Sequence, residues 1–258
     1  MANFPCRQVA GRTLPETLPE TGVAKCHRIA TFAGKLNMSF PLSPNYALTG
    51  RELSWIAASY FIGCFTAGYY WTRWRTGQDI REVGSGNVGA RNVGRTLGKG
   101  GFTITLLIDA AKGGLVVAGA VGLGLRPEAV VASVLAVVIG HNWPLQLRFQ
   151  GGKGIAVSVG ALLAYDPFLV LALLAVFLPV LAMFRNVTLS GMIAFALAPL
   201  TTFLCGVPKV EVAIVSILAV LVLLTHRRNI REEVARIGGP RPATESSVPM
   251  HKGSNDEV

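Results

Sequence analysis

Charged residues are scarce in this chain of 258 residues: they make up 15% of it, against about 25% in an ordinary soluble domain. Hydrophobic residues make up 51%, and the mean hydropathy is +0.48. The apolar residues come in long blocks rather than alternating with polar ones, so they need a solvent as apolar as themselves. The composition therefore predicts a membrane protein and excludes a disordered or fibrous one.

Signatures of several other protein classes are also missing. The four cysteines have no CxxC spacing, so we expect neither a disulfide framework nor a zinc site. Residues 1–50 hold no apolar run long enough for a signal peptide. Lys153 is not followed by the hydroxyl residue of a Walker A loop, so ATP hydrolysis by that route is not expected. We expect no metal and no cofactor.

Seven apolar blocks predict an all-α, polytopic membrane protein with about seven transmembrane helices. The blocks cover residues 53–72, 102–125, 129–147, 153–165, 167–184, 187–207 and 210–225. The fourth block would cover only about 20 Å at 1.5 Å per residue, whereas the hydrocarbon core is about 30 Å thick. We therefore expect one short helix that is tilted, partly re-entrant or shielded by its neighbours.

The blocks divide the chain into a polar tail at 1–51, a membrane domain at 52–230 and a second polar tail at 231–258. Lysine and arginine gather on one side of the predicted spans, and the positive-inside rule places that side, with the C-terminus, in the cytoplasm. The first tail conflicts with this orientation, because it would carry six cations across the membrane: Arg7, Arg12, Lys25, Arg28, Lys35 and Arg51. A translation start at Met38 would remove five of them and is the alternative.

The net charge of +10 leaves three kinds of partner open: nucleic acid, an anionic lipid surface or a phosphorylated small molecule. The glycine-rich segment 84–95 can turn backbone amides toward an anion. Ser85, Asn87 and Asn92 add neutral donors. Arg95 adds a charged fork that suits phosphate. The segment also contains a GxGxxG pattern, but a dinucleotide site would need a strand before it, and here it lies between membrane helices.

A second glycine-rich turn, Gly151-Gly152-Lys153-Gly154, precedes the short fourth block. A lysine on a flexible turn before a helix lies near free backbone amides and the positive end of the helix dipole, which favours an anion. The alternative is a lysine that only anchors the chain at the membrane surface. The three flanking glycines favour the binding site.

Polar residues also occur inside or at the ends of the blocks. Asp109 and Lys112 are three residues apart, so they share a helix face and can neutralise each other. The pair is either a packing element or part of a site. His141 and His226 lie near the glycine-rich segments. No paired histidine and aspartate are evident within one of these motifs, so an enzyme of this sequence would work by holding its substrates rather than through an activated nucleophile.

Five groups of residues follow one another between about residues 52 and 235: Gly84 to Arg95, Leu107-Ile108-Asp109 with Lys112, Gly140-His141, Gly151 to Ala156, and His226-Arg227 with Asn229-Ile230. In this order and spacing they resemble the acyl-phosphate-dependent glycerol-3-phosphate acyltransferase (PlsY) family. The resemblance implies a seven-helix enzyme of the bacterial inner membrane. Its reaction would move a fatty acyl chain from acyl phosphate to the 1-hydroxyl of glycerol 3-phosphate and give lysophosphatidate.

The resemblance also implies roles for individual residues. The catalytic residues would be Ser85, Arg95 and Lys153. The substrate-binding residues would be Gly86, Asn87, Gly89, Asn92, Gly152, Gly154, His226 and Asn229. Further candidates are Arg91, Asp109, Lys112, His141 and Ser190. The expected partners are the two phosphorylated substrates and membrane lipid, and not nucleic acid.

Three positions depart from the pattern of this family. Arg91 and Val157 stand where the family usually has threonine, and no glutamate follows Asn229 in the usual Gly-x-Glu ending. The alternative function is therefore a diverged, non-catalytic paralogue or a carrier that binds a lipid phosphate or another organic anion. A conventional transporter is disfavoured, because no two-fold repeat of the spans is evident.

Overall fold

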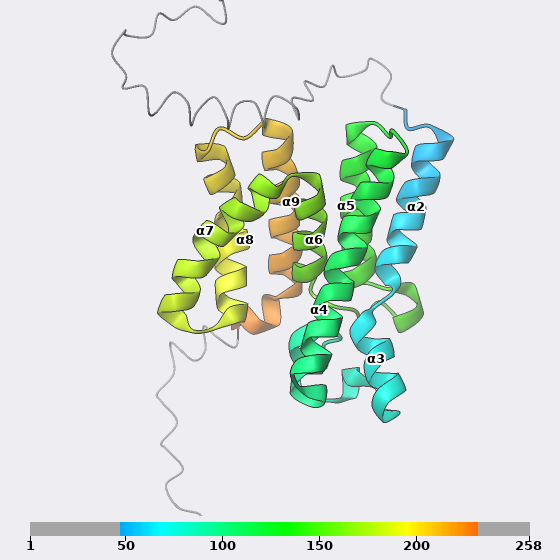
Figure 1. The fold of residues 1–258 in the computed structure, drawn as a ribbon, viewed down its shortest axis with the longest axis vertical. Coiled ribbons are helices and arrows are strands. Elements are labelled where there is room, and N and C mark those ends of the chain that lie inside the picture. The colour runs from blue at the N-terminus through cyan, green and yellow to red at the C-terminus, as the bar shows by residue number, and fades with distance from the viewer. Residues whose placement is uncertain (1–46, 232–258) are drawn as a thin grey trace, which may run out of the picture. The chain divides into compact units, whose positions relative to one another are not determined.

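The computed structural model describes residues 47–231. The alternative start at Met38 and nearly all of both predicted tails lie outside these residues. Every regular element within 47–231 is helical, which confirms the all-α prediction. In chain order (Figure 1) they are α2 (Gly50–Cys64), α3 (Ala67–Thr76), η1 (Ile80–Glu82), α4 (Ala90–Gly122), α5 (Pro127–Asn142), η2 (Leu145–Leu147), α6 (Ile155–Tyr165), α7 (Pro167–Phe184), α8 (Val187–Leu204) and α9 (Lys209–Thr225).

Four stretches are long and apolar enough to cross a membrane: α4, α5 together with η2, α7 and α8. The helices α2, α6 and α9 are shorter, at 15, 11 and 17 residues. Each predicted block thus contains a helix, and α6 is the short one that the sequence predicts.

The first predicted span, 53–72, is interrupted in the structure. Phe65 and Thr66 are extended, so α2 ends at Cys64 and α3 begins at Ala67. The carbonyls of Gly63 and Phe65 would lose their helical partners at this break. Instead they accept hydrogen bonds from the ammonium of Lys112 on α4, at 3.1 and 2.7 Å. The sequence could not predict the break, because its stabilising partner lies 47 residues or more away along the chain.

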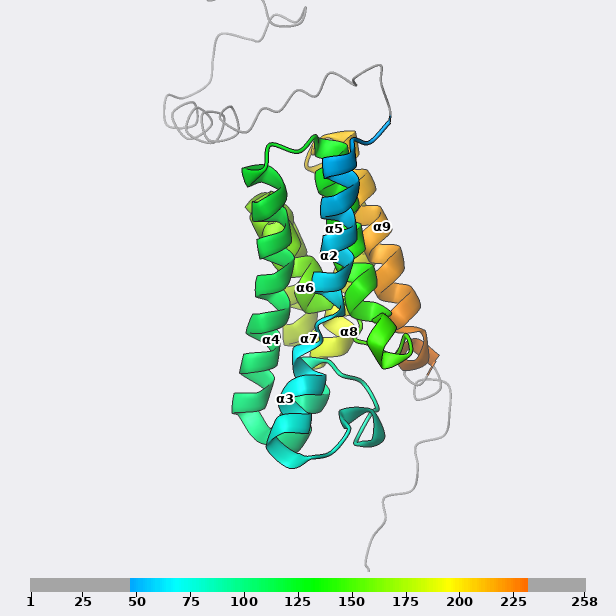
Figure 2. The ribbon, with the colours of Figure 1, turned by 90° about the vertical axis from the view of Figure 1, so that its right-hand side faces the viewer.

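The helix α4 begins twelve residues before the block predicted at 102–125. Gly98 interrupts its helical geometry with a φ of 72° and a ψ of −169°, a conformation that glycine adopts without the steric cost of a side chain. The segment before the kink carries the second half of the first glycine-rich motif. Figure 2 shows α4 along one edge of the bundle, with α3 beside its lower part.

The helices form two groups, which contact each other through α6 with α7 and through α5 with α9; Figure 1 shows α7, α8 and α9 beside the remaining helices. In the first group α2 packs on α5, and α4 packs on α5 and α6. In the second group α7 packs on α8, and α8 packs on α9. Fully buried aliphatic side chains, among them Val116, Val137, Val157 and Leu218, form one core that runs through both groups.

Close backbone contact with α4 shields the short helix α6. A Cβ on Gly113 of α4 would lie 2.2 Å from the carbonyl oxygen of Val157, and a Cβ on Gly160 of α6 would lie 1.9 Å from that of Ala110. Small residues allow membrane helices to approach in this way. Of the three situations expected for the short helix, shielding by neighbours is the one that these contacts support.

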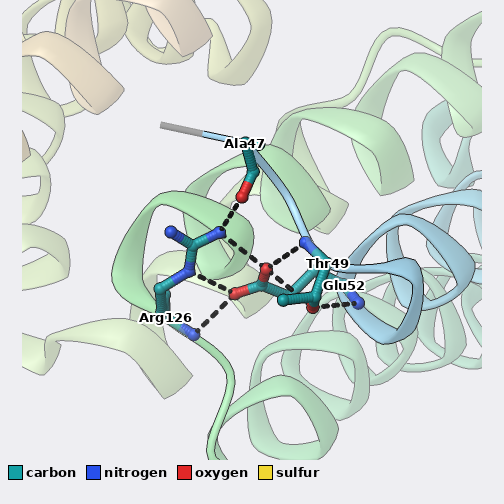
Figure 3. Close-up of polar contacts among 4 residues, drawn as sticks. All are labelled: Ala47, Thr49, Glu52 and Arg126. Atoms are coloured by element: carbon teal, nitrogen blue, oxygen red, sulfur yellow. Dashed lines mark hydrogen bonds and ion pairs between the residues drawn. The ribbon is translucent and has the colours of Figure 1, made fainter. Parts of the chain in front are cut away.

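The start of α2, at the end of the helix away from α3, is fixed by a polar cluster (Figure 3). Thr49 and Glu52 form a capping box, in which the Glu52 carboxylate accepts from the Thr49 amide at 2.8 Å. Arg126, in the connection between α4 and α5, donates to both oxygens of Glu52 at 2.8 Å and also to the carbonyl of Ala47. The charge-assisted bonds hold the start of α2 against the start of α5.

Candidate functional site

A cavity of about 1030 Å³ lies between the two groups of helices. We call it the inner cavity. The two glycine-rich segments, the residues that follow α9 and side chains of α4, α6, α7 and α8 line it. The candidates from the sequence that line it are Ser85, Gly86, Asn87, Gly89, Arg91, Asn92, Arg95, Asp109, His141, Gly152, Lys153, Gly154, His226 and Asn229. Lys112 and Ser190 are not among the lining residues.

The first glycine-rich segment is a loop that Asn92 holds in shape. The Asn92 side chain is buried; its oxygen accepts from the Ser85 amide at 2.9 Å, and its nitrogen donates to the carbonyls of Ile80 and Val83 at 3.2 and 2.8 Å. A Cβ on Gly84 would lie 2.4 Å from this oxygen, and the φ of Gly84 is +61°. We expected Asn92 to be a donor to phosphate, but both of its amide hydrogens are used within the loop.

Other polar groups of this loop line the inner cavity. The Asn87 oxygen accepts from the Gly89 amide at 3.1 Å, which leaves the Asn87 side-chain nitrogen as a donor. Ser85 and Arg95 are exposed and line the cavity. Arg91 donates to the hydroxyl of Thr188 and so connects the starts of α4 and α8.

Arg81 is a cavity residue that the sequence analysis did not identify. It forms an ion pair with Asp79 at 2.6 Å and donates to the carbonyl of Leu147 at 3.1 Å. The hydrogen bonds between the two side chains lower the pKa of Asp79 and raise the pKa of Arg81. Arg81 therefore connects η1 to η2. These two short helices precede the first and the second glycine-rich segment. Arg228 also lines the cavity. It was not a candidate from the sequence, although its position beside Asn229 could have identified it.

The second glycine-rich turn packs directly on the end of α5. The amide of Gly152 donates to the carbonyl of His141 at 2.9 Å, and a Cβ on Gly152 would lie 2.0 Å from Nε2 of the His141 ring. Gly154 has a φ of +81° and precedes α6, whose first amides receive no side-chain cap. Uncapped amides at a helix N-terminus are a favourable setting for an anion.

Lys153 joins this turn to the end of α9. Its ammonium donates to the side-chain oxygen of Asn229, and its carbonyl accepts from the Thr225 hydroxyl at 3.0 Å. Two motifs that are 76 residues apart in sequence therefore meet at one end of the cavity.

His226 is a buried hydrogen-bond acceptor at the same end. Its Nδ1 lies 2.8 Å from the carbonyl oxygen of Val222, which can only accept, so Nδ1 carries the hydrogen and Nε2 offers a lone pair. Burial lowers the pKa of His226 to about 4, so the ring is neutral near pH 7. A neutral Nε2 can accept a hydrogen bond from a substrate hydroxyl.

Asp109, Lys112 and His141 form a buried cluster at the wall of the inner cavity, which Asp109 and His141 line. Lys112 lies 3.0 Å from Asp109, which confirms the predicted pairing, and its ammonium donates to Nδ1 of His141 at 2.8 Å. Asp109 and His141 themselves lie 3.6 Å apart. The structure thus brings a histidine and an aspartate together from α5 and α4, although no single motif contains them.

The remaining candidate, Ser190, is fully buried in α8 and donates to the carbonyl of Asn186 at 2.8 Å. Its neighbours Thr188 and Gly191 line the cavity instead. Among residues 47–231, no group of three histidine, cysteine, aspartate or glutamate side chains could hold a metal ion.

The other wall of the inner cavity is apolar. It is formed by Phe102, Leu106, Ile155, Val159, Leu173, Leu174, Phe177 and Phe195. The cavity can therefore hold anionic groups against its glycine-rich end and a hydrocarbon chain against its helices. Val157, one of the departures noted in the sequence, is fully buried in the core and is not a lining residue, so the absence of threonine there removes no hydroxyl from this wall.

Comparison with protein-family models matches residues 53–236 to the family described as glycerol-3-phosphate acyltransferase. Glycerol-3-phosphate acyltransferase 1 of Desulfitobacterium hafniense is 43% identical over 182 residues, which cover 70% of this chain and 90% of that protein. A glycerol-3-phosphate acyltransferase 1 of Bacillus cereus is 39% identical over 183 residues, which cover 71% of this chain and 98% of that protein.

Two crystal structures of PlsY (YgiH), an integral membrane glycerol 3-phosphate acyltransferase, have a similar fold. The glycerol 3-phosphate form superposes with a TM-score of 0.67 at 33% identity and covers 72% of this chain and 93% of that one. The lysophosphatidic acid form gives a TM-score of 0.65 at 30% identity with the same coverage. The family match includes all the residues that line the inner cavity.

Proposed function

Because the chain belongs to the glycerol-3-phosphate acyltransferase family, we propose that it moves a fatty acyl chain from acyl phosphate to the 1-hydroxyl of glycerol 3-phosphate. The products are lysophosphatidate and inorganic phosphate, and the reaction is the first step of phospholipid synthesis. The observation that carries this proposal is the inner cavity, in which two glycine-rich anion settings lie beside an apolar wall. Two phosphorylated substrates, one with a hydrocarbon chain, require such a combination.

In the proposed reaction the 1-hydroxyl oxygen attacks the carbonyl carbon of acyl phosphate, and the bond from this carbon to the phosphate oxygen breaks. Phosphate is a good leaving group, so positioning and charge neutralisation supply much of the rate. The hydroxyl proton passes to a phosphate oxygen of the substrates. No activated protein nucleophile is then required.

The residues divide between the two substrates. Arg95, Ser85 and the loop at 84–89 hold the acyl phosphate. Lys153 binds the phosphate of glycerol 3-phosphate, and Asn229 holds the Lys153 ammonium in place. Nε2 of His226 accepts a hydrogen bond from a glycerol hydroxyl.

The chain is a membrane protein, and we place it in the bacterial inner membrane with its C-terminus in the cytoplasm. The support is the gathering of cations at the end of the bundle where the cavity has its polar lining, including Arg81, Arg95, Lys153 and Arg228. The positive-inside rule assigns such an end to the cytoplasm, where glycerol 3-phosphate is available.

The test is an activity measurement with the purified full-length protein, palmitoyl phosphate and glycerol 3-phosphate, in which lysophosphatidate is measured by mass spectrometry. We expect lysophosphatidate and inorganic phosphate in equal amounts. Lys153→Ala and Arg95→Ala should each abolish turnover, because each removes a cation from a phosphate. Lys209→Ala is the control, since Lys209 is exposed at the opposite end of α9.

A folded wild-type protein that forms no lysophosphatidate would exclude the acyltransferase and favour the non-catalytic paralogue. Full activity of either cavity variant would show that its phosphate contact is assigned wrongly.

A further inference from the structure

A second, open pocket of about 480 Å³ lies along the first part of α4. We call it the outer pocket. Arg91, Gly94, Arg95, Lys99, Phe102 and Thr103 line it. Arg91, Arg95 and Phe102 also line the inner cavity, so the two spaces share a wall and are neighbours. Lys99 lines only the outer pocket, and the reaction described above does not use it.

The charge of the outer pocket is of one sign. Its three cations, Arg91, Arg95 and Lys99, line one space, and the Gly98 kink lies between the last two. Like charges gathered in one pocket repel each other, and no carboxylate is among the lining residues. A bound anion would relieve this repulsion, and three clustered donors of charge-assisted hydrogen bonds suit a phosphate.

The outer pocket becomes apolar in the direction of the membrane-spanning part of α4. Arg91 and Arg95 precede the Gly98 kink and Lys99 directly follows it, whereas Phe102 lies further along α4 and has an exposed side chain. Leu106, one helical turn further, is also exposed and lines the inner cavity. The outer pocket therefore offers cations for a head group, and the residues beyond them offer an apolar surface for a hydrocarbon chain that lies in the bilayer.

We propose that the outer pocket binds a single-chain phosphate amphiphile from the membrane and that this ligand is the acyl phosphate on its way to the inner cavity. The identity of the ligand rests on the proposed function. The shared residues Arg91 and Arg95 would keep a cation on the phosphate as it passes between the two spaces.

The test compares Lys99→Ala with a matched control, Arg75→Ala. Arg75 is an exposed cation in the last turn of α3, which packs on α4, and it lines neither space. In nanodiscs, Lys99→Ala should lower kcat/KM for palmitoyl phosphate roughly 5-fold, as expected for one cation near a charged lipid surface. The KM for glycerol 3-phosphate should not change, and Arg75→Ala should match the wild type for both substrates.

A binding measurement separates this inference from the proposed reaction. Isothermal titration calorimetry of the full-length protein with decyl phosphate measures the affinity directly. Lys99→Ala should bind decyl phosphate more weakly than the wild type, by a factor similar to the loss of kcat/KM. If the wild type makes no lysophosphatidate but this loss is seen, the acyltransferase fails and the outer pocket stands.

Equal decyl phosphate affinities in Lys99→Ala and Arg75→Ala would overturn the inference. So would a Lys99 dependence that appears only with phosphatidylglycerol in the nanodisc and not with decyl phosphate, because the ligand would then be a two-chain phospholipid.

Discussion

Lys112 shows how much one buried side chain can organise. Its ammonium contacts the carbonyls at the break between α2 and α3, the carboxylate of Asp109 and the ring of His141. The break leads into α3 and the first glycine-rich loop, and His141 supports the second glycine-rich turn. The sequence correctly predicts the pair with Asp109 from their spacing. It could not predict the other contacts, because they join residues 29 to 49 positions apart.

Replacing Lys112 by methionine should therefore destabilise the protein strongly. Removal of one partner leaves a buried carboxylate without a counter-charge, which typically costs about 3–5 kcal/mol. Thermal unfolding in detergent measures the effect. The double variant Lys112→Met with Asp109→Leu should recover much of the loss, because no unpaired charge remains. A single variant as stable as the wild type would contradict the role given to this ion pair.

His226 should make stability depend on pH in a defined window. Its pKa is about 4 when folded and 6.5 for the unperturbed side chain, so between these values the unfolded protein binds more protons. Stability should then fall as the pH decreases from about 6.5 toward about 4 and show no contribution from His226 above this range. The melting temperature measured against pH tests this, and His226→Gln should flatten the dependence. An identical pH profile in the variant would assign the effect to another group.

At the scale of helices, the sequence predicts where apolar segments occur better than where helices begin and end. All seven blocks contain helices, yet α4 starts twelve residues early and the first block is divided. Hydropathy reports which residues tolerate lipid, whereas the break at Phe65 and the kink at Gly98 depend on backbone conformation and on partners from other helices. The close contact of α4 with α6 is likewise a property of two glycines that lie 47 residues apart.

The close contact between α4 and α6 leads to a prediction for Gly113 of α4. Gly113→Ala would place a methyl group 2.2 Å from a backbone oxygen of α6, so we expect a loss of about 1–3 kcal/mol, which is typical of overpacking. Gly100→Ala is the matched control in the same helix, because nothing lies within 4 Å of its Cβ position. There the better helix propensity of alanine should stabilise by about 0.5–1 kcal/mol. Chemical or thermal unfolding of both variants gives the comparison, and equal stabilities would contradict the packing argument.

For the whole molecule, the cavity is made of motifs that the sequence identifies separately. Fourteen candidates, drawn from all five groups of residues named in the sequence, line one space, and Lys153 meets Asn229 there. Sequence reasoning missed Arg81 and Thr188, because neither lies within a glycine-rich motif. It gave Asn92 a ligand-binding role, whereas its side chain shapes the loop. Residue types thus predict which segments line the cavity, and only the packing of helices shows which of their polar groups already have partners.

The helix α6 is too short to cross a bilayer by itself. Eleven residues cover about 16 Å at 1.5 Å per residue, roughly half of a hydrocarbon core of about 30 Å. The turn that carries Lys153 stands at the start of this half-length helix, so α6 by itself cannot carry the chain from that turn across a hydrocarbon core. In the proposed reaction, transfer to glycerol 3-phosphate competes with hydrolysis of the acyl phosphate, and the apolar side chains that α6 gives to the inner cavity, Ile155 and Val159, keep water from the activated chain.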